Sequence, residues 1–168
     1  MTISTVAKHV SSPESEEMIS SFLPAHPEGV LTTLNSSGTL QSSVINVFTK
    51  DDYQLVFMTR RSTQKFKNLQ HNPTVSFICY DTFSRAEVAI EGIASVIADS
   101  TQIKETLEMI KKDAKNGSHH ISPYVTQDDD YVLFTIHPRK IHMTTYWKRK
   151  EKMEAFHESI EFELAMKS

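Results

Sequence analysis

The sequence contains little glycine, and this scarcity excludes several well-known nucleotide and nucleophile motifs. Its 168 residues include four glycines, and the closest pair, Gly29 and Gly38, lies nine positions apart. The dinucleotide fingerprint G-x-G-x-x-G, the phosphate loop G-x-x-x-x-G-K and the nucleophile elbow G-x-S-x-G each need two glycines within five positions. None of these three motifs is therefore present.

Cysteine and long apolar runs are also scarce. Cys79 is the only cysteine, so the chain can form neither an internal disulfide nor a cysteine-based zinc cluster. The first twenty residues hold no apolar run that could form a signal-peptide core. The uncharged stretch 29–49 is rich in Ser, Thr, Asn and Gln, whose polar groups would stay unpaired in lipid. We therefore expect a cytoplasmic protein with no bound metal and no membrane partner.

Charge of one sign is not in excess either. Eighteen basic and 21 acidic residues give a formal net charge of -3, which offers no overall attraction for nucleic acid. We therefore expect no nucleic-acid partner. At 39% hydrophobic and 23% charged residues, the chain has the composition of one compact domain.

The spacing of apolar residues predicts a mainly β (α+β) fold. Alternation of apolar and polar residues indicates strands, and apolar residues three or four positions apart indicate helices. The expected helices cover 13–23, 62–69, 101–115 and 149–166, and the expected strands cover 30–34, 39–48, 53–59, 75–80, 86–97, 131–137 and 140–146. Six or seven antiparallel strands between short helices favour a small barrel, because closure removes exposed sheet edges.

Two terminal segments flank the predicted barrel of residues 13–147. Residues 1–12 are polar, and we expect a loose N-terminal arm. Residues 148–168 contain Met153, Phe156, Ile160 and Leu164 at helical spacing, which predicts a C-terminal helix packed on the barrel or on a partner.

The segment 57–69 is the strongest candidate for a ligand-binding site. The end of a predicted strand leads into Arg60, Arg61, Ser62, Thr63 and Lys65 at the start of a short helix. Hydroxyls and helix-start amides can donate hydrogen bonds to a phosphate while the cations neutralise its charge. The alternative interpretation is a solvated basic turn in which Thr63 is an ordinary helix N-cap.

Several separated motifs resemble one family. They are Leu31–Gly38, Gln41–Val47, Val56–Thr59 followed by Ser62–Lys65, Asn68-Leu69, Asn72–Ser76 and Val88–Ala94. Their order and spacing resemble the pyridoxamine 5′-phosphate oxidase-like FMN-binding split barrels, over roughly residues 13–146. The resemblance implies a split β-barrel of six to seven antiparallel strands with short flanking helices.

The resemblance also implies a homodimer with one FMN in each of two clefts between the subunits. By position, Thr63, Gln64 and Lys65 would hold the phosphate with help from Arg60 or Arg61. The other residues implied at the site are Ser43, Val44, Ile45 and Asn46 at the ring edge through strand backbone, Met58 and Thr59 beneath the ring and ribityl chain, Glu87 as a contact from the long strand, and Thr144 near the place of a flavin-stacking tryptophan. For Ile45 and Met58, plain core packing is the alternative.

Two departures separate the chain from the true oxidase of this family. Phe48 occupies the place of a substrate-binding lysine, and no arginine-histidine motif follows Trp147. The resemblance therefore implies a small flavin-dependent oxidoreductase with a small-molecule redox substrate rather than pyridoxamine phosphate oxidation. The alternatives are a deazaflavin-dependent reductase and a non-catalytic flavin-binding or haem-binding stress protein.

Overall fold

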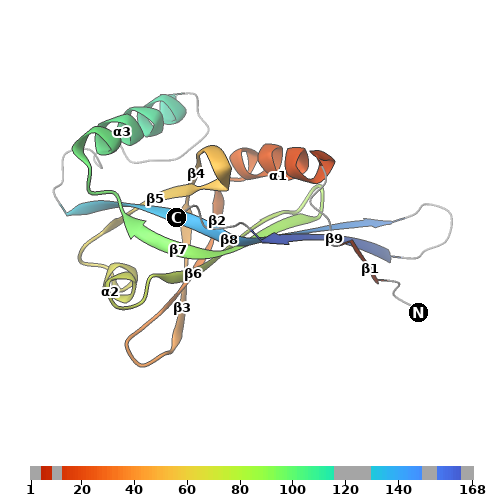
Figure 1. The fold of residues 1–168 in the computed structure, drawn as a ribbon, viewed down its shortest axis with the longest axis horizontal. Coiled ribbons are helices and arrows are strands. Elements are labelled where there is room, and N and C mark those ends of the chain that lie inside the picture. The colour runs from red at the N-terminus through yellow and green to blue at the C-terminus, as the bar shows by residue number, and fades with distance from the viewer. Residues whose placement is uncertain (1–4, 9–12, 116–129, 149–154, 164–168) are drawn as a thin grey trace.

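The structure, a computed structural model, describes residues 5–8, 13–115, 130–148 and 155–163. A curled, mainly antiparallel sheet carries three α-helices (Figure 1). The elements in chain order are β1 (Thr5–Lys8), α1 (Pro13–Ala25), β2 (Glu28–Leu34), β3 (Leu40–Asn46), β4 (Phe48–Thr49), the 3₁₀ turn η1 (Asp51–Tyr53), β5 (Leu55–Arg60), α2 (Gln64–His71), β6 (Thr74–Asp81), β7 (Ala86–Val96), α3 (Ser100–Lys115), β8 (Tyr131–Lys148) and β9 (Ala155–Glu163).

The strands pair as in a barrel in which two neighbouring strands are not joined by hydrogen bonds. The main path runs β1-β9-β8-β7-β6-β2-β3, and β5 pairs with β8 on one side and with β4 on the other. Only Val47 separates β3 from β4. The chain therefore passes from β3, which pairs with β2, directly to β4, which pairs with β5. In the described part of the chain β3 pairs with β2 alone, which leaves a split between β3 and β5. The predicted mainly β split-barrel fold is confirmed.

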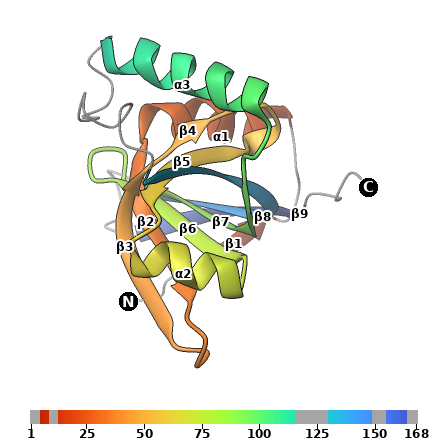
Figure 2. The same ribbon diagram turned by 90° about the vertical axis from the view of Figure 1, so that its left-hand side faces the viewer.

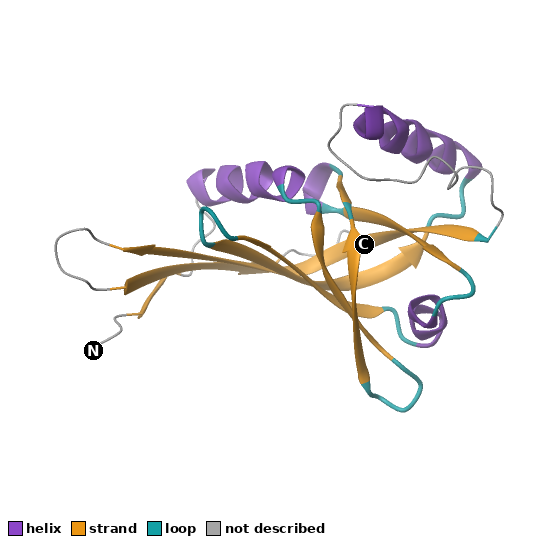
Figure 3. Cartoon of the chain, turned by 180° about the vertical axis from the view of Figure 1, so that it is seen from behind, coloured by secondary structure: helices purple, strands orange, loops and turns teal. Residues whose placement is uncertain are grey.

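The β2–β3 hairpin forms from the expected strands 30–34 and 39–48. The Asn35 side-chain oxygen accepts hydrogen bonds from the backbone N–H groups of Ser37 and Thr39, at 3.0 and 2.8 Å. Gly38 has a φ of 78°, a conformation that residues with a Cβ adopt at a cost. The hairpin projects away from the sheet (Figure 3).

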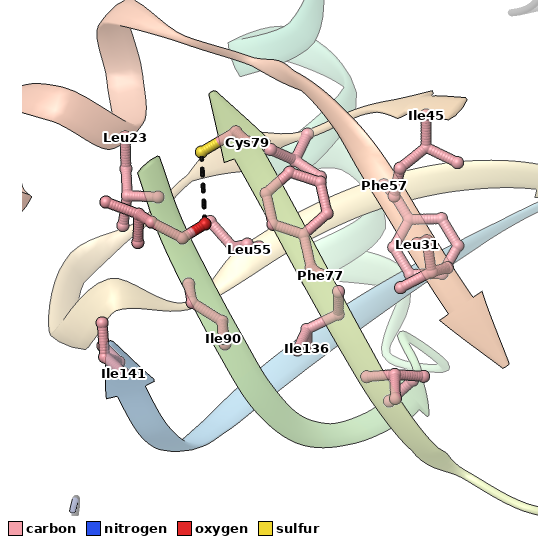
Figure 4. Packing of buried hydrophobic residues seen from close by; sticks show 14 of the residues in the cluster. Leu23, Leu31, Ile45, Leu55, Phe57, Phe77, Cys79, Ile90, Ile136 and Ile141 are labelled. Atoms are coloured by element: carbon pink, nitrogen blue, oxygen red, sulfur yellow. Dashed lines mark hydrogen bonds between the residues drawn. The ribbon is translucent and has the colours of Figure 1, made fainter. Parts of the chain in front are cut away.

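Two apolar clusters hold the fold together. The larger lies inside the curl of the sheet, where Leu31, Phe57, Phe77 and Ile136 are each 0% exposed (Figure 4). The smaller lies beneath α3 and joins Phe48, Val56, Ile97, Ile110 and Leu133. Figures 1 and 2 show α1 and α3 on one side of the sheet and α2 on the other. No helix of the described ranges has both the length and the apolar character needed to cross a bilayer.

The prediction of two separate strands at 131–137 and 140–146 is wrong, because one long strand, β8, covers both. Gly92 faces Pro138 and Glu91 faces Lys140, so Arg139 is the extra residue of a β-bulge. A bulge accommodates proline, which lacks the N–H that a regular ladder needs. A Cβ on Gly92 would lie 2.5 Å from the carbonyl oxygen of His137, so glycine permits this close approach.

The C-terminal helix predicted over 149–166 is also wrong where the structure describes that region. Residues 155–163 form strand β9, which pairs antiparallel with β8 from Lys140 to Lys148. Phe156 and Ile160 are four positions apart, a spacing that fits a helix, yet with Phe162 they also fit the two-residue period of a strand. The predicted stripe residues Met153 and Leu164 lie outside the described residues.

The expectation of a loose N-terminal arm fails at residues 5–8. These residues form β1, which pairs in parallel with His157–Ile160 of β9. Both corrections have one physical reason: the second half of β8 extends past the barrel and offers a free edge that β9, and then β1, complete. The remaining arm residues, 1–4 and 9–12, lie outside the described residues.

Candidate functional site

The candidate site begins where β5 ends and α2 starts. The chain turns after Arg60, and the backbone N–H of Thr63 donates to the Arg60 carbonyl oxygen at 3.1 Å. The start of β8 closes the turn from the other side, because Ser62 Oγ donates to Asp130 Oδ2 at 3.0 Å and the Arg61 N–H donates to the Asp130 carbonyl at 2.8 Å. We call residues 59–65 the cradle.

Thr63 is the N-cap of α2, as one interpretation of the sequence proposed. Its hydroxyl accepts a hydrogen bond from the Phe66 N–H at 3.2 Å and donates to the Arg60 carbonyl at 2.8 Å. Thr59 Oγ1 lies 3.0 Å from Thr63 Oγ1. The Thr63 hydroxyl is thus fully used by the protein, and helix geometry leaves the N–H groups of Gln64 and Lys65 without an intrahelical acceptor.

Three cations surround this helix start. The guanidinium of Arg60 lies 4.9 Å from the centre of the Tyr131 ring, and that of Arg61 lies 5.7 Å from the centre of the Phe66 ring. Lys65 is half-buried, and burial lowers the pKa of its ammonium group. Within the described ranges no carboxylate forms an ion pair with Lys65. An anion bound here would therefore meet a partly desolvated positive charge.

The four residues predicted at the ring edge lie on β3, beside the split. Their side chains alternate, so Ser43 and Ile45 face the interior and Val44 and Asn46 face outward. Ile45 is buried in the larger apolar cluster, whereas Val44 is 71% exposed. The β3 edge that faces β5 carries no ladder in the described part of the chain. The backbone amides and carbonyls on that edge therefore have no ladder partner among the described residues.

Met58 and Thr59 lie on opposite faces of β5. Met58 packs against the cluster beneath α3, while Thr59 shares the interior face with Phe57 and touches Thr63. Thr59 is therefore part of the cradle. The Met58 side chain packs in the core, which was the alternative interpretation of that residue.

Glu87 and Thr144 do not meet the cradle within one chain. They face each other across the β7–β8 ladder, whereas Thr59 of the cradle faces Val132 on β8. The twelve positions between Val132 and Thr144 correspond to roughly 40 Å of strand. Within one subunit the cradle and the Glu87–Thr144 pair therefore lie at distant positions along β8.

Sequence reasoning missed the role of Asn68. This residue of α2 is 1% exposed, and its amide bonds to Gln64, Thr33 and Gln41. The signal available in the sequence was an asparagine beside Leu69 on the buried face of a short helix. Its partners on β2 and β3 are distant in sequence, and the helix pattern does not reveal them.

A separate cavity of about 930 Å³ lies away from the cradle. It is lined by α1, the β4–η1 segment and Met109 of α3. No residue of the cradle lines it, so the cavity and the cradle are distinct features of the fold.

Comparison with solved structures identifies the same fold in proteins with different ligands. A pyridoxamine 5′-phosphate oxidase-related, FMN binding protein from Nostoc punctiforme is 16% identical, with a TM-score of 0.56 over 91% of this chain and 98% of that chain. An F420 reductase is 21% identical, with a TM-score of 0.57 over 71% and 92%. A heme binding protein from Mycobacterium smegmatis is 15% identical, with a TM-score of 0.62 over 87% and 59%. At these identities the likeness shows the fold.

The family follows from a comparison of the sequence itself. No curated protein matches the chain. The family model described as pyridoxamine 5′-phosphate oxidase, however, matches residues 15–145, which is more than three quarters of the chain. The match includes the cradle, the split between β3 and β5, and most of β8. The chain therefore belongs to the pyridoxamine 5′-phosphate oxidase family.

Proposed function

We propose that this protein is a homodimeric FMN-binding flavoprotein that acts as a small flavin-dependent oxidoreductase. The observation that carries the proposal is the cradle, where half-buried Lys65 lies at the start of α2 without an ion-pair partner among the described residues. A dianionic phosphate is suited to such a place, because it can accept hydrogen bonds from helix-start amides and from an ammonium group at once.

The open edge of β3 supports a place for the flavin ring. A flavin has a polar edge of ring nitrogens and oxygens and two apolar faces. The backbone groups of residues 43–46 that point away from β2 can bond to that edge, and Thr59 lies across the split from them. The cradle and the β3 edge together therefore offer what the phosphate and the ring each need.

The distance between the cradle and Glu87 supports the dimer. By strand alternation Glu87 and Thr144 point to the outer side of the sheet, where Thr144 is 4% exposed. They lie next to a row of register neighbours that runs across four strands and consists of Val44, Val30, Ile78 and Ala89. Val44 and Ile78 are 71% and 37% exposed. A second copy seated on this apolar row would bring its own cradle toward Glu87 and Thr144.

FMN would supply the redox chemistry, and the chain would bind, orient and shield it. Lys65 and the Gln64 and Lys65 amides would hold the phosphate, and residues 43–46 would orient the ring edge. The donor set of the cradle does not suit haem, because residues 59–65 include no His, Cys, Met or Tyr that could ligate its iron. A deazaflavin carries a similar ring, and its identification in the purified protein would replace FMN in this proposal.

The cofactor is tested by a titration with a matched pair of variants. Purified protein is examined by visible spectroscopy, and released chromophore is identified by mass. Apoprotein is then titrated with FMN and with riboflavin, which lacks the phosphate. Lys65→Ala should weaken FMN binding by roughly 1.5–3 kcal/mol and riboflavin binding much less. Lys67→Ala, an exposed lysine of the same helix, should bind both ligands as the wild type does. Absence of FMN binding by the wild type would refute the assignment.

The dimer is tested by sedimentation across a dilution series, with and without FMN. Ile78→Asp places a charge in the apolar row and should shift the protein toward monomer and weaken FMN binding together, because each subunit supplies part of the site. Ser36→Asp, in the exposed turn of the β2–β3 hairpin, should leave both unchanged. A monomer that binds FMN with wild-type affinity would overturn the shared-site arrangement.

A further inference from the structure

The split between β3 and β5 is bridged by side chains of α2 instead of by backbone pairing. α2 follows β5 directly and packs against β2, with Leu69 4% exposed and Asn68 1% exposed. Asn68 thus lies where the cradle side of the split meets the β2–β3 side. A buried amide at this place costs free energy unless its hydrogen bonds are made.

Asn68 uses its amide oxygen and both amide hydrogens in hydrogen bonds. Its Oδ1 accepts from Gln64 Nε2 at 2.9 Å. Its Nδ2 donates to Thr33 Oγ1 on β2 and to Gln41 Oε1 on β3, both at 2.9 Å. Thr33 Oγ1 in turn donates to the Gln41 backbone carbonyl at 3.3 Å.

Thr33 and Gln41 face each other across the β2–β3 ladder. The Asn68 amide therefore donates to both members of this cross-strand pair, and its oxygen accepts from Gln64, the first residue of α2. These bonds fix the place of the helix start relative to β3. Because the Asn68 amide is buried, its hydrogen bonds stiffen the contact between the elements that they join.

We propose that Asn68 is a positioning residue that sets the separation between the phosphate cradle and the flavin-ring edge on β3. This inference rests on the proposed FMN function and extends it to a residue that touches neither half of the cofactor. FMN spans the split, so its two ends bind together only when the cradle and β3 stand at the matching distance. Riboflavin uses the ring edge alone and needs no such match.

Gln41 offers a test with little risk to the fold, because its side chain is largely exposed. Gln41→Met keeps the length of the side chain and removes the acceptor for Asn68. FMN affinity should fall about 3- to 10-fold, the effect of one lost hydrogen bond, and riboflavin affinity should change less than twofold. Gln70→Met, an exposed glutamine on the same helix, is the matched control and should bind both ligands as the wild type does.

Asn68→Leu removes the whole network, and a double-mutant cycle separates positioning from general loss of stability. If Asn68 acts through the cradle, Asn68→Leu should cost less FMN affinity in the Lys65→Ala background than in the wild type. Asn72→Ala is the control for helix stability, since Asn72 ends α2 and its Oδ1 accepts from the Thr74 N–H. It should lower the melting temperature without changing the ratio of FMN to riboflavin affinity.

Hydrogen exchange of apoprotein gives a readout that does not depend on flavin. Gln41→Met should speed exchange of the α2 amides, and Gln70→Met should not. Equal exchange in both variants, or an unchanged FMN-to-riboflavin ratio in Gln41→Met and Asn68→Leu, would overturn the positioning role. If the wild type binds no FMN while Gln41→Met still speeds exchange of the α2 amides and Gln70→Met does not, the proposed function is refuted and the coupling between α2 and β3 stands.

Discussion

His26 Nε2 lies 3.7 Å from Asp81 Oδ2, and this contact joins the segment after α1 to the end of β6. The His26 ring also stacks on Phe22 with 4.0 Å between ring centres, and its Nδ1 lies 2.8 Å from the Phe22 carbonyl oxygen. Asp81 accepts hydrogen bonds from the Ser84 hydroxyl and from the Ser84 and Phe83 amides. The Asp81 carboxylate thus stabilises the β6–β7 turn and also contacts His26, which directly follows α1.

Asp81→Asn should remove a pH-dependent part of the stability. The Ser84 hydroxyl, the Ser84 and Phe83 amides and His26 lower the pKa of Asp81 to about 2, against about 3.9 in an unfolded chain. Its contribution is therefore present above about pH 4 and is lost as the pH falls toward 2. Urea unfolding between pH 2 and 5 should show a smaller slope with pH for the variant. Equal slopes in both proteins would contradict the role of Asp81.

FMN affinity should fall as the pH becomes alkaline, and the fall should begin at a lower pH than the pKa of an ordinary lysine would give. Burial lowers the pKa of Lys65, so this group loses its proton, and its attraction for phosphate, earlier than an exposed lysine does. The stability of the apoprotein should change in the opposite direction and rise over the same pH range, because the folded state favours the neutral form. Parallel titrations with FMN and riboflavin check this. Lys65→Arg should move the loss of FMN affinity to higher pH, and an identical profile in that variant would exclude Lys65 as the titrating group.

Thr63→Ala should destabilise the fold by about 1 kcal/mol, the usual cost of losing an N-cap. The hydroxyl caps Phe66 and also binds the Arg60 carbonyl, so Thr63→Ser should retain most of the stability. Urea unfolding of the three apoproteins measures this difference. If Thr63→Ala kept full stability but lost FMN affinity and not riboflavin affinity, the hydroxyl would be a phosphate ligand instead of a cap.

Two glycines should respond to substitution for different reasons. A Cβ on Gly29 would press on the Phe77 ring and lie 2.5 Å from the Ile78 carbonyl oxygen, so Gly29→Ala should cost about 1–3 kcal/mol. Gly38 has open space around it but a φ of +78°, so Gly38→Ala should cost about 1 kcal/mol. Asparagine tolerates this φ, and thermal unfolding should therefore show recovery in Gly38→Asn and further loss in Gly29→Asn. Recovery at both positions would contradict the steric role of Gly29.

The sequence predicted the elements that depend on local signals. α1 begins at Pro13, the first residue of its predicted range, and α2 follows its N-cap Thr63. The β2–β3 turn depends on Asn35 and Gly38, which lie within four residues of each other. In each of these cases the stabilising partners are close along the chain, so a short window of sequence contains the whole cause.

The failures have nonlocal causes. β9 is a strand because the far half of β8 presents a free edge to it, and no window around Phe156 contains that information. Asn68 and Gln41 are 27 positions apart, so the network across the split could not be derived from the helix pattern. The opposite faces of Met58 and Thr59 were predictable from strand alternation alone, although the resemblance placed both beneath one ring.

The long strand β8 has a consequence for the order in which the protein can fold during synthesis. β5 pairs only with the two-residue β4 and with β8 in the described ranges, and β8 begins at Tyr131 of a 168-residue chain. Until that strand leaves the ribosome, the earlier strands cannot close into a barrel, and the edges of β5 and β7 stay open to intermolecular pairing. The pairings of β5 and β7 with β8 therefore form only after residues 131–148 have been made, and such long-range pairing favours slow folding.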